Sequence, residues 1–218
     1  MGKVQQGILD GFVGKVGTVV GSFWKGKPVM RGYKRIVHDA STEAQELIRT
    51  RFAAIGSLSS AFYNAILLGF KGVARAKKIT EGDYFVKVNW DYVHAEAAGS
   101  ATVDYDELMV AKGNLPEILF GSATFTDPYK VKVGINDQGT AVGARNDDLV
   151  YIFVYSPEAA AGVISQSVMR EEAEVSVTVP DYWVGQRVHV YGFGIGDPQH
   201  DNAGRTANSR YLGSGTIN

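Results

Sequence analysis

Glycine recurs every three to six residues through the first 32 positions of the chain. The glycines of this stretch are Gly2, Gly7, Gly11, Gly14, Gly17, Gly21, Gly26 and Gly32. Glycine adds no side chain to a core and loses more backbone freedom on folding than other residues, so such a stretch becomes ordered only where its backbone is held. We therefore expect residues 1–40 to form a glycine-rich arm that is ordered by contact with its own chain or with a neighbouring molecule.

Valines and aromatic residues lie between the glycines, and they favour docking through the backbone. An extended arm can lie flat against a neighbouring sheet or helix, with main-chain hydrogen bonds supplying affinity and apolar side chains filling shallow pockets. The residues that we expect to form this assembly arm are Gly7, Gly11, Gly14, Gly17, Gly21, Val16, Val19 and Trp24.

The same arm is basic, which leaves nucleic acid open as its partner. Proteins bind single strands with cations and interleaved aromatic rings, because the cations neutralise phosphates and the rings stack on bases. The candidate polyanion-binding residues are Lys15, Lys25, Lys27, Arg31, Lys34 and Arg35. A phosphate-binding loop is excluded at Gly14–Gly17, because no Gly-Lys-Ser/Thr follows at the required spacing.

Charge is unevenly distributed along the chain. The net charge is −1, but residues 1–78 hold 13 Lys and Arg against 4 acidic residues, a balance of +9 that leaves −10 for residues 79–218. Segments of opposite sign indicate a basic arm for nucleic acid, complementary surfaces on successive copies of one protein, or solvated surfaces that differ only in sign. Charge alone leaves these three interpretations open.

Residues 41–80 are predicted to be helical. Thr42 and Gln45 fit a capping box at a helix start. Apolar residues then recur mostly three or four positions apart, which makes one stripe along a helix. They are Leu47, Ile48, Phe52, Ile55, Leu58, Phe62, Ile66 and Leu67. We expect a bend or break at Gly56, because glycine costs about 1 kcal/mol relative to alanine; one long helix and a helical hairpin both fit the pattern.

From residue 81 to residue 218 the apolar residues alternate with polar ones, which is typical of β-strands. The strand-like segments are 84–90, 129–133, 149–155, 175–179 and 187–191. Turn residues separate them at spacings typical of an antiparallel sandwich. We therefore predict an α+β chain in which the glycine-rich arm and a helical segment precede an immunoglobulin-like or fibronectin-like β-sandwich.

Three parts of the sequence resemble a known family. They are Met1-Gly2-Lys3-Val4 with Gly7-Ile8, Gly11–Gly21 and Trp24-Lys25-Gly26; Asp104-Tyr105-Asp106 with Val110–Pro116; and Ala207–Ser214. Together they are similar to a family of Bacteroidota proteins of comparable length that is catalogued as a domain of unknown function. The resemblance implies an N-terminal helical part and a C-terminal β domain, and it transfers no catalytic residue or ligand. Asp10 stands where the family has a second glycine before the aromatic residue.

Residues that carry catalysis or bind cofactors are sparse. The chain has no cysteine and no Gly-x-Ser-x-Gly motif, which excludes a cysteine nucleophile and the serine elbow of α/β-hydrolases. Gly192–Gly196 follows a strand-like segment, but Asp197-Pro198 comes next instead of the helix that a dinucleotide site needs. We expect no enzymatic activity, no cofactor and no metal.

The histidines and the paired acidic residues have structural interpretations. Asp197–Asn202 offers oxygen and nitrogen ligands for a divalent ion, but a polar loop is the favoured interpretation. His189 lies between two valines, so we expect it to face solvent on the opposite side of its strand. Charged turns and exposed strand positions, rather than a catalytic pair, account for Glu171-Glu172 with Glu174, Asp147-Asp148, and Asp104 with Asp106-Glu107.

We therefore predict a non-enzymatic structural protein that self-associates through its N-terminal arm and helix, such as a virion component of a phage that infects Bacteroidota. Its expected partners are further copies or other structural proteins, with nucleic acid left open and no membrane. The N-terminus lacks a secretion-signal pattern, so we expect cytoplasmic synthesis and, for a phage protein, residence in the virion. Two alternatives remain: a nucleic-acid-binding protein that uses the basic N-terminal third, and a glycan-binding or adhesive β-sandwich with Tyr182, Trp183 and Tyr191 as candidate residues.

Overall fold

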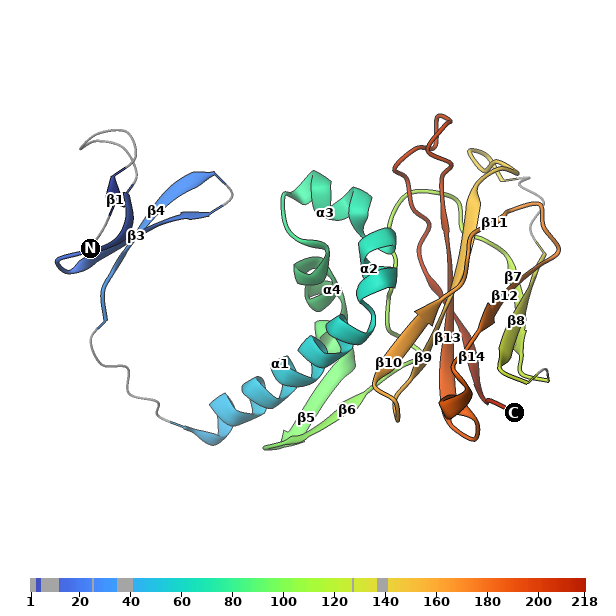
Figure 1. Ribbon diagram of the computed structural model, residues 1–218, viewed down its shortest axis with the longest axis horizontal. Helices are drawn as coiled ribbons and strands as arrows, with labels where there is room; N and C mark the ends of the chain where they lie inside the picture. The colour runs from blue at the N-terminus through green and yellow to red at the C-terminus, as the bar shows by residue number, and fades with distance from the viewer. Residues whose placement is uncertain (1–2, 5–11, 25, 35–40, 127, 137–140) are drawn as a thin grey trace. The chain divides into compact units, whose positions relative to one another are not determined.

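The computed structural model describes residues 3–4, 12–24, 26–34, 41–126, 128–136 and 141–218. The chain divides into two compact units, Met1–Thr42 and Glu43–Asn218. The described part of the first unit forms strands, and the second unit contains helices followed by antiparallel sheets (Figure 1). The predicted α+β class is therefore confirmed.

The arm forms an antiparallel sheet of its own, in the order β1-β2-β3-β4. Its strands are β1 Lys3–Val4, β2 Phe12–Val16, β3 Val19–Trp24 and β4 Lys27–Gly32. Gly17 and Gly26 have φ angles of +58° and +75° in the turns after β2 and β3. Glycine adopts this left-handed backbone without the steric cost of a Cβ, as hairpin turns require. Neighbouring strands of the same arm therefore hold part of the glycine-rich backbone.

Helices open the second unit: α1 Glu43–Ala61, α2 Tyr63–Gly69, α3 Lys71–Lys77 and α4 Glu81–Asn89. The predicted bend at Gly56 is wrong, because α1 continues through this residue and the chain bends by 80° between α1 and α2. Phe62 at the bend packs its ring against that of Phe153, with 4.7 Å between the centroids. Among the described residues no single helix is long and apolar enough to cross a membrane, although α1 and α2 together reach that length and composition.

The strand predicted at residues 84–90 is also wrong, because most of this segment belongs to helix α4. Thr80 is the N-cap of α4, and its hydroxyl oxygen accepts a hydrogen bond from the backbone N–H of Asp83 at 3.1 Å. This bond satisfies one of the free N–H groups at a helix start. Tyr84 and Phe85 are buried against the other helices. The helical part of the chain therefore extends past residue 80.

In the described residues after α4, antiparallel strands form three sheets. Their bounds are β5 Val93–Ala97, β6 Ser100–Val103, β7 Phe120–Thr124, β8 Lys130–Ile135, β9 Leu149–Ser156, β10 Ala161–Ile164, β11 Val168–Met169, β12 Glu174–Thr178, β13 Arg187–Ile195 and β14 Arg210–Thr216. Strands β10-β9-β13-β14, with β11 paired to β9, form a five-stranded sheet. Strands β12-β8-β7 form a second sheet, and β5-β6 form a hairpin. Short 3-10 helices span Trp90–Tyr92 and Asp181–Trp183.

The five-stranded sheet is the middle layer of the second unit, between the helices and the three-stranded sheet (Figure 1). Strand β9 shows how both faces are filled. Val150, Ile152 and Val154 join the core between the two sheets, whereas Phe153 and Tyr155 join the core beneath the helices. Because side chains alternate across a strand, the alternation of aliphatic and aromatic residues in β9 corresponds to two cores and not to an inside and an outside.

Candidate functional site

The strand register of the arm sheet places a set of uncharged side chains on one face. Antiparallel partners lie on the same face of a sheet. The pairs on this face are Gly14 with Gly21, Val16 with Val19, Val19 with Gly32, Gly21 with Met30, and Phe23 with Pro28. Within β3, β4 and the paired part of β2, this face carries no charged side chain. We call it the uncharged face.

The opposite face of the same strands carries cations. Its pairs are Lys15 with Val20, Val20 with Arg31, Ser22 with Val29, and Trp24 with Lys27. The Lys15 ammonium lies 3.6 Å from the centroid of the Tyr33 ring, a cation–π contact. We call this surface the cationic face. The predicted polyanion-binding residues Lys15, Lys27 and Arg31 therefore lie together, Lys34 follows β4, and Lys25 and Arg35 lie outside the described residues.

Large apolar side chains of the arm are exposed. On the uncharged face the exposed fractions are 69% for Met30, 52% for Val16 and 41% for Phe23. On the cationic face Trp24 is 61% exposed. Contiguous exposed apolar side chains are typical of interaction surfaces. The predicted assembly residues Val16 and Trp24 are both exposed, but the register places them on opposite faces of the sheet.

Three of the predicted assembly glycines have roles inside the arm. A Cβ on Gly21 would lie 2.2 Å from the backbone oxygen of Phe12, so this glycine allows the start of β2 to cross β3 closely. Gly17 forms the turn between β2 and β3. Gly14 has φ of +104° within β2, a conformation that favours glycine. The predicted residues Gly7 and Gly11 lie outside the described part of the chain.

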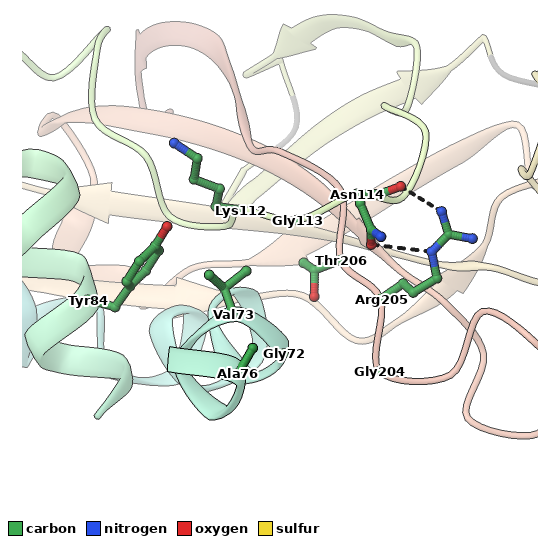
Figure 2. Close-up of a pocket in the computed structure, with 10 residues that line it drawn as sticks. All are labelled: Gly72, Val73, Ala76, Tyr84, Lys112, Gly113, Asn114, Gly204, Arg205 and Thr206. Atoms are coloured by element: carbon green, nitrogen blue, oxygen red, sulfur yellow. Dashed lines mark hydrogen bonds between the residues drawn. The ribbon is translucent and has the colours of Figure 1, made fainter. Parts of the chain in front are cut away.

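The second unit has a pocket of about 440 Å³ between α3, α4, residues 112–114 and the loop that follows β13 (Figure 2). Its lining residues are Gly72, Val73, Ala76, Tyr84, Lys112, Gly113, Asn114, Gly204, Arg205 and Thr206. Figure 2 shows the Arg205 guanidinium turned toward Asn114. Arg205 donates to the Asn114 side-chain oxygen at 3.3 Å and to its backbone oxygen at 2.7 Å. The guanidinium is therefore held in a defined orientation at the pocket wall.

A second pocket of about 430 Å³ adjoins the first. It shares Gly72, Gly204 and Thr206 with the first pocket, and its other lining residues are Leu68, Lys71, Arg75, Leu149, Tyr151, Ile195, Gly196 and Pro198. Helix α3 thus contributes side chains to both pockets. The volume of each pocket falls in the range of small-molecule sites.

His189 is buried, which corrects the prediction that it faces solvent. It is 8% exposed, because the face of β13 opposite the valines lies against the core beneath the helices and not against water. Its Nδ1 lies 3.0 Å from the Tyr211 hydroxyl, and its ring stacks on that of Tyr105 with 4.2 Å between centroids. Burial lowers the pKa of His189 to about 4, so the imidazole is neutral at physiological pH.

The aromatic residues predicted for a glycan-binding module are mostly buried. Trp183 and Tyr191 are fully buried in the two cores, whereas Tyr182 is exposed. The Tyr191 hydroxyl donates to the backbone oxygen of Tyr105 at 2.6 Å. A carbohydrate stacks on exposed ring faces, so Tyr182 is the one member of this predicted set with a ring available for it.

A group with metal-ligand spacing lies on the surface of the second unit. His200 Nε2 lies 2.7 Å from Asp147 Oδ2 and 3.7 Å from Asp197 Oδ2. Arg145 Nε lies 3.1 Å from Asp147 Oδ1, and this hydrogen bond lowers the pKa of the Asp147 carboxyl. Because Arg145 and His200 both contact this carboxylate, we interpret the group as a surface ion-pair network. Asp147 joins the predicted 197–202 loop only through the tertiary structure.

Asp148 is fully buried, which corrects its interpretation as part of an exposed charged turn. Its Oδ2 lies 3.5 Å from Arg170 Nη1, and its Oδ1 accepts a hydrogen bond from the Asn202 amide at 3.0 Å. Arg170 also donates to the backbone oxygens of Pro116 and Glu117. A buried charge needs a partner and hydrogen bonds, so this network ties four separate chain segments together.

A model of the family described as "Family of unknown function (DUF6266)" matches residues 11–213. No curated protein matches the chain. Among solved structures, the fn3 domain of the human collagen alpha-1(XX) chain is similar at 13% sequence identity and a TM-score of 0.31, over 49% of this chain and 84% of that chain.

Proposed function

This chain belongs to the DUF6266 family of unknown function, and from its surfaces we propose that it is a non-enzymatic structural protein that self-associates through its N-terminal arm. The observation that carries the proposal is the uncharged face of the arm sheet. Val16, Phe23 and Met30 are exposed there, and the register keeps the strand cations on the other face. Burial of such a face against another protein removes apolar surface from water without desolvating a charge.

A second copy of the chain is the partner that charge favours. Residues 1–42 hold seven Lys and Arg and two acidic residues, a balance of +5, which leaves −6 for residues 43–218. Helices α1 and α2 add a second exposed apolar surface on the acidic unit; its residues are Ile48, Phe52, Tyr63 and Leu67. Docking of one copy's arm on α1 and α2 of another would bury both apolar surfaces, and the opposite net charges of the two units favour the encounter of two copies.

The molecular mass in solution tests this proposal with two matched variants. The first is Val16→Glu with Met30→Glu, which places two negative charges on the uncharged face. The second is Lys15→Gln with Arg31→Gln, which changes the net charge by the same amount on the opposite face of the same strands. Light scattering after gel filtration should show an oligomer for the wild-type chain and the control, and a monomer for Val16→Glu with Met30→Glu.

Two results would overturn the proposal. One is a monomeric wild-type chain at every concentration measured, which includes the case of an arm that docks on its own chain. The other is an unchanged mass for Val16→Glu with Met30→Glu. Far-ultraviolet circular dichroism of each variant shows whether the arm sheet and the second unit remain folded, so that unfolding is not read as dissociation.

The cationic face favours nucleic acid as a second candidate partner. Lys15, Lys27 and Arg31 lie on one face of the sheet together with Trp24 and Tyr33, the combination that binds phosphates and stacks bases. If this face binds single-stranded DNA or RNA, affinity should fall steeply with salt, and Lys15→Gln with Arg31→Gln should lower the slope of log K against log salt by roughly 1.4. A salt slope that this variant leaves unchanged would exclude the cationic face.

A further inference from the structure

We propose that the two adjoining pockets of residues 43–218 form one groove that binds a small organic anion, a phosphate or carboxylate attached to a flat apolar group. The two pockets share Gly72, Gly204 and Thr206. The proposal concerns the second unit alone and does not depend on self-association of the arm. It rests on the charge, the partners and the rigidity of the residues that line the groove.

The lining of the groove is cationic, although the unit that contains it has a net charge of −6. Lys71 and Arg75 line one pocket, and Lys112 and Arg205 line the other. Neither set of lining residues includes an aspartate or a glutamate. In a unit where acidic residues outnumber basic ones, four cations without an acidic neighbour in the lining favour an anionic ligand.

These cations are available to a ligand. In the described part of the chain, Lys71, Arg75 and Lys112 form no ion pair with a carboxylate. Arg205 is held by neutral groups, because it also donates to the Asn202 side-chain oxygen at 2.9 Å in addition to its bonds to Asn114. An arginine that neutral acceptors orient keeps its full positive charge for a bound anion.

The groove also has apolar walls that fit the rest of such a ligand. Val73, Ala76 and Tyr84 line the first pocket together with Lys112 (Figure 2). In the second pocket Tyr151 is stacked on Phe193, with 5.7 Å between ring centroids, which holds its ring in place. A fixed aromatic ring beside cations suits a ligand that combines a planar group with an anionic one.

Close backbone contacts keep the groove rigid. A Cβ on Gly72 would lie 2.5 Å from the Gly204 backbone oxygen, and one on Gly113 would lie 2.0 Å from the Thr206 oxygen. Leu115 donates its backbone N–H to the same Thr206 oxygen at 3.0 Å. These contacts join the 112–115 segment to the 204–206 loop, so the walls are preorganised for binding.

Calorimetric titration of the full chain tests the proposal with three small probes. Phenyl phosphate and benzoate share a ring and differ in the anion, and benzyl alcohol has the ring without charge. We expect saturable heats of binding for phenyl phosphate, benzoate or both. We expect no saturable binding of benzyl alcohol. Saturable binding of all three, or of none, would overturn the proposal.

A charge-matched pair of variants locates the site. Lys71→Gln with Arg75→Gln removes two cations from the groove, whereas Lys87→Gln with Lys130→Gln removes two exposed cations outside both linings. The first variant should weaken binding by about tenfold or more, as expected for loss of a hydrogen bond to a charged group. The second should bind as the wild-type chain does. An equal effect of both variants would show that the probes respond to general surface charge and would refute the groove as the site.

Discussion

Acidification should destabilise this protein through His189. The imidazole is enclosed by Tyr105 and Tyr211 beneath the helices, and it is 8% exposed. Burial lowers its pKa from the ordinary 6.5 to about 4; Arg187 adds to this shift, and Asp106 opposes it. Between these two values the unfolded chain binds a proton that the folded chain does not, so stability falls as the pH falls.

The size of the effect follows from the two pKa values. Below 6.5 the unfolded state gains the proton first, and the loss is complete only below the folded value of about 4. Linkage then gives a loss of about 0.8 kcal/mol at pH 6 and about 2.5 kcal/mol at pH 4.5, relative to pH 7.5. Against the stability of an ordinary domain, about 5–15 kcal/mol, this loss is large enough to measure.

Urea unfolding at several pH values isolates this contribution when it is measured on wild-type protein and on His189→Asn. The asparagine amide can replace Nδ1 in the contact with Tyr211 but does not titrate. The stability difference between wild type and variant should therefore shrink by about 2.5 kcal/mol between pH 7.5 and pH 4.5. A difference that stays constant for His189→Asn across this range would refute the buried neutral imidazole.

Two further pairs of substitutions test the packing. Gly56→Ala should raise the free energy of unfolding by up to about 1 kcal/mol, because nothing lies within 4 Å of the added Cβ; Gly69→Ala should lower it by about 1–3 kcal/mol, because its Cβ would lie 2.2 Å from the Val110 oxygen. Equal signs in denaturant titrations would contradict this packing. Trp183→Ala should lower the free energy of unfolding by about 3–5 kcal/mol, because the Trp183 side chain is fully buried. Tyr182→Ala, at an exposed residue, should change it by no more than about 0.5 kcal/mol. A comparable loss for both variants would contradict their different burial.

The behaviour of the arm shows how far glycine spacing can be interpreted. The spacing predicts a backbone-docking segment, and Gly17 and Gly26 do provide the turns. Spacing does not show that the strands pair with one another, since pairing depends on which segments meet. The register that separates Lys15 and Arg31 from Val16 and Met30 therefore required the structure.

The two wrong predictions for the second unit, a strand at residues 84–90 and a solvent-facing His189, have a common physical cause. The alternation around Lys87 satisfies a strand pattern, but Thr80 caps a helix start there and Tyr84 and Phe85 share a buried helix face. His189 alternates with valines, but both faces of its strand are covered. Short apolar segments fit helix and strand patterns alike, and long-range packing decides between them.

The sequence by itself determined the α+β class, the order of arm, helices and sheets, and the unequal charge of the two ends. These properties depend on composition and on neighbours within a few residues, which a sequence displays directly. Only the tertiary structure decided the separation of uncharged and cationic faces, the burial of His189, the Asp148–Arg170 pair and the cationic groove. Each of these depends on contacts between residues on different strands, helices or loops, which strand register and layer packing bring together.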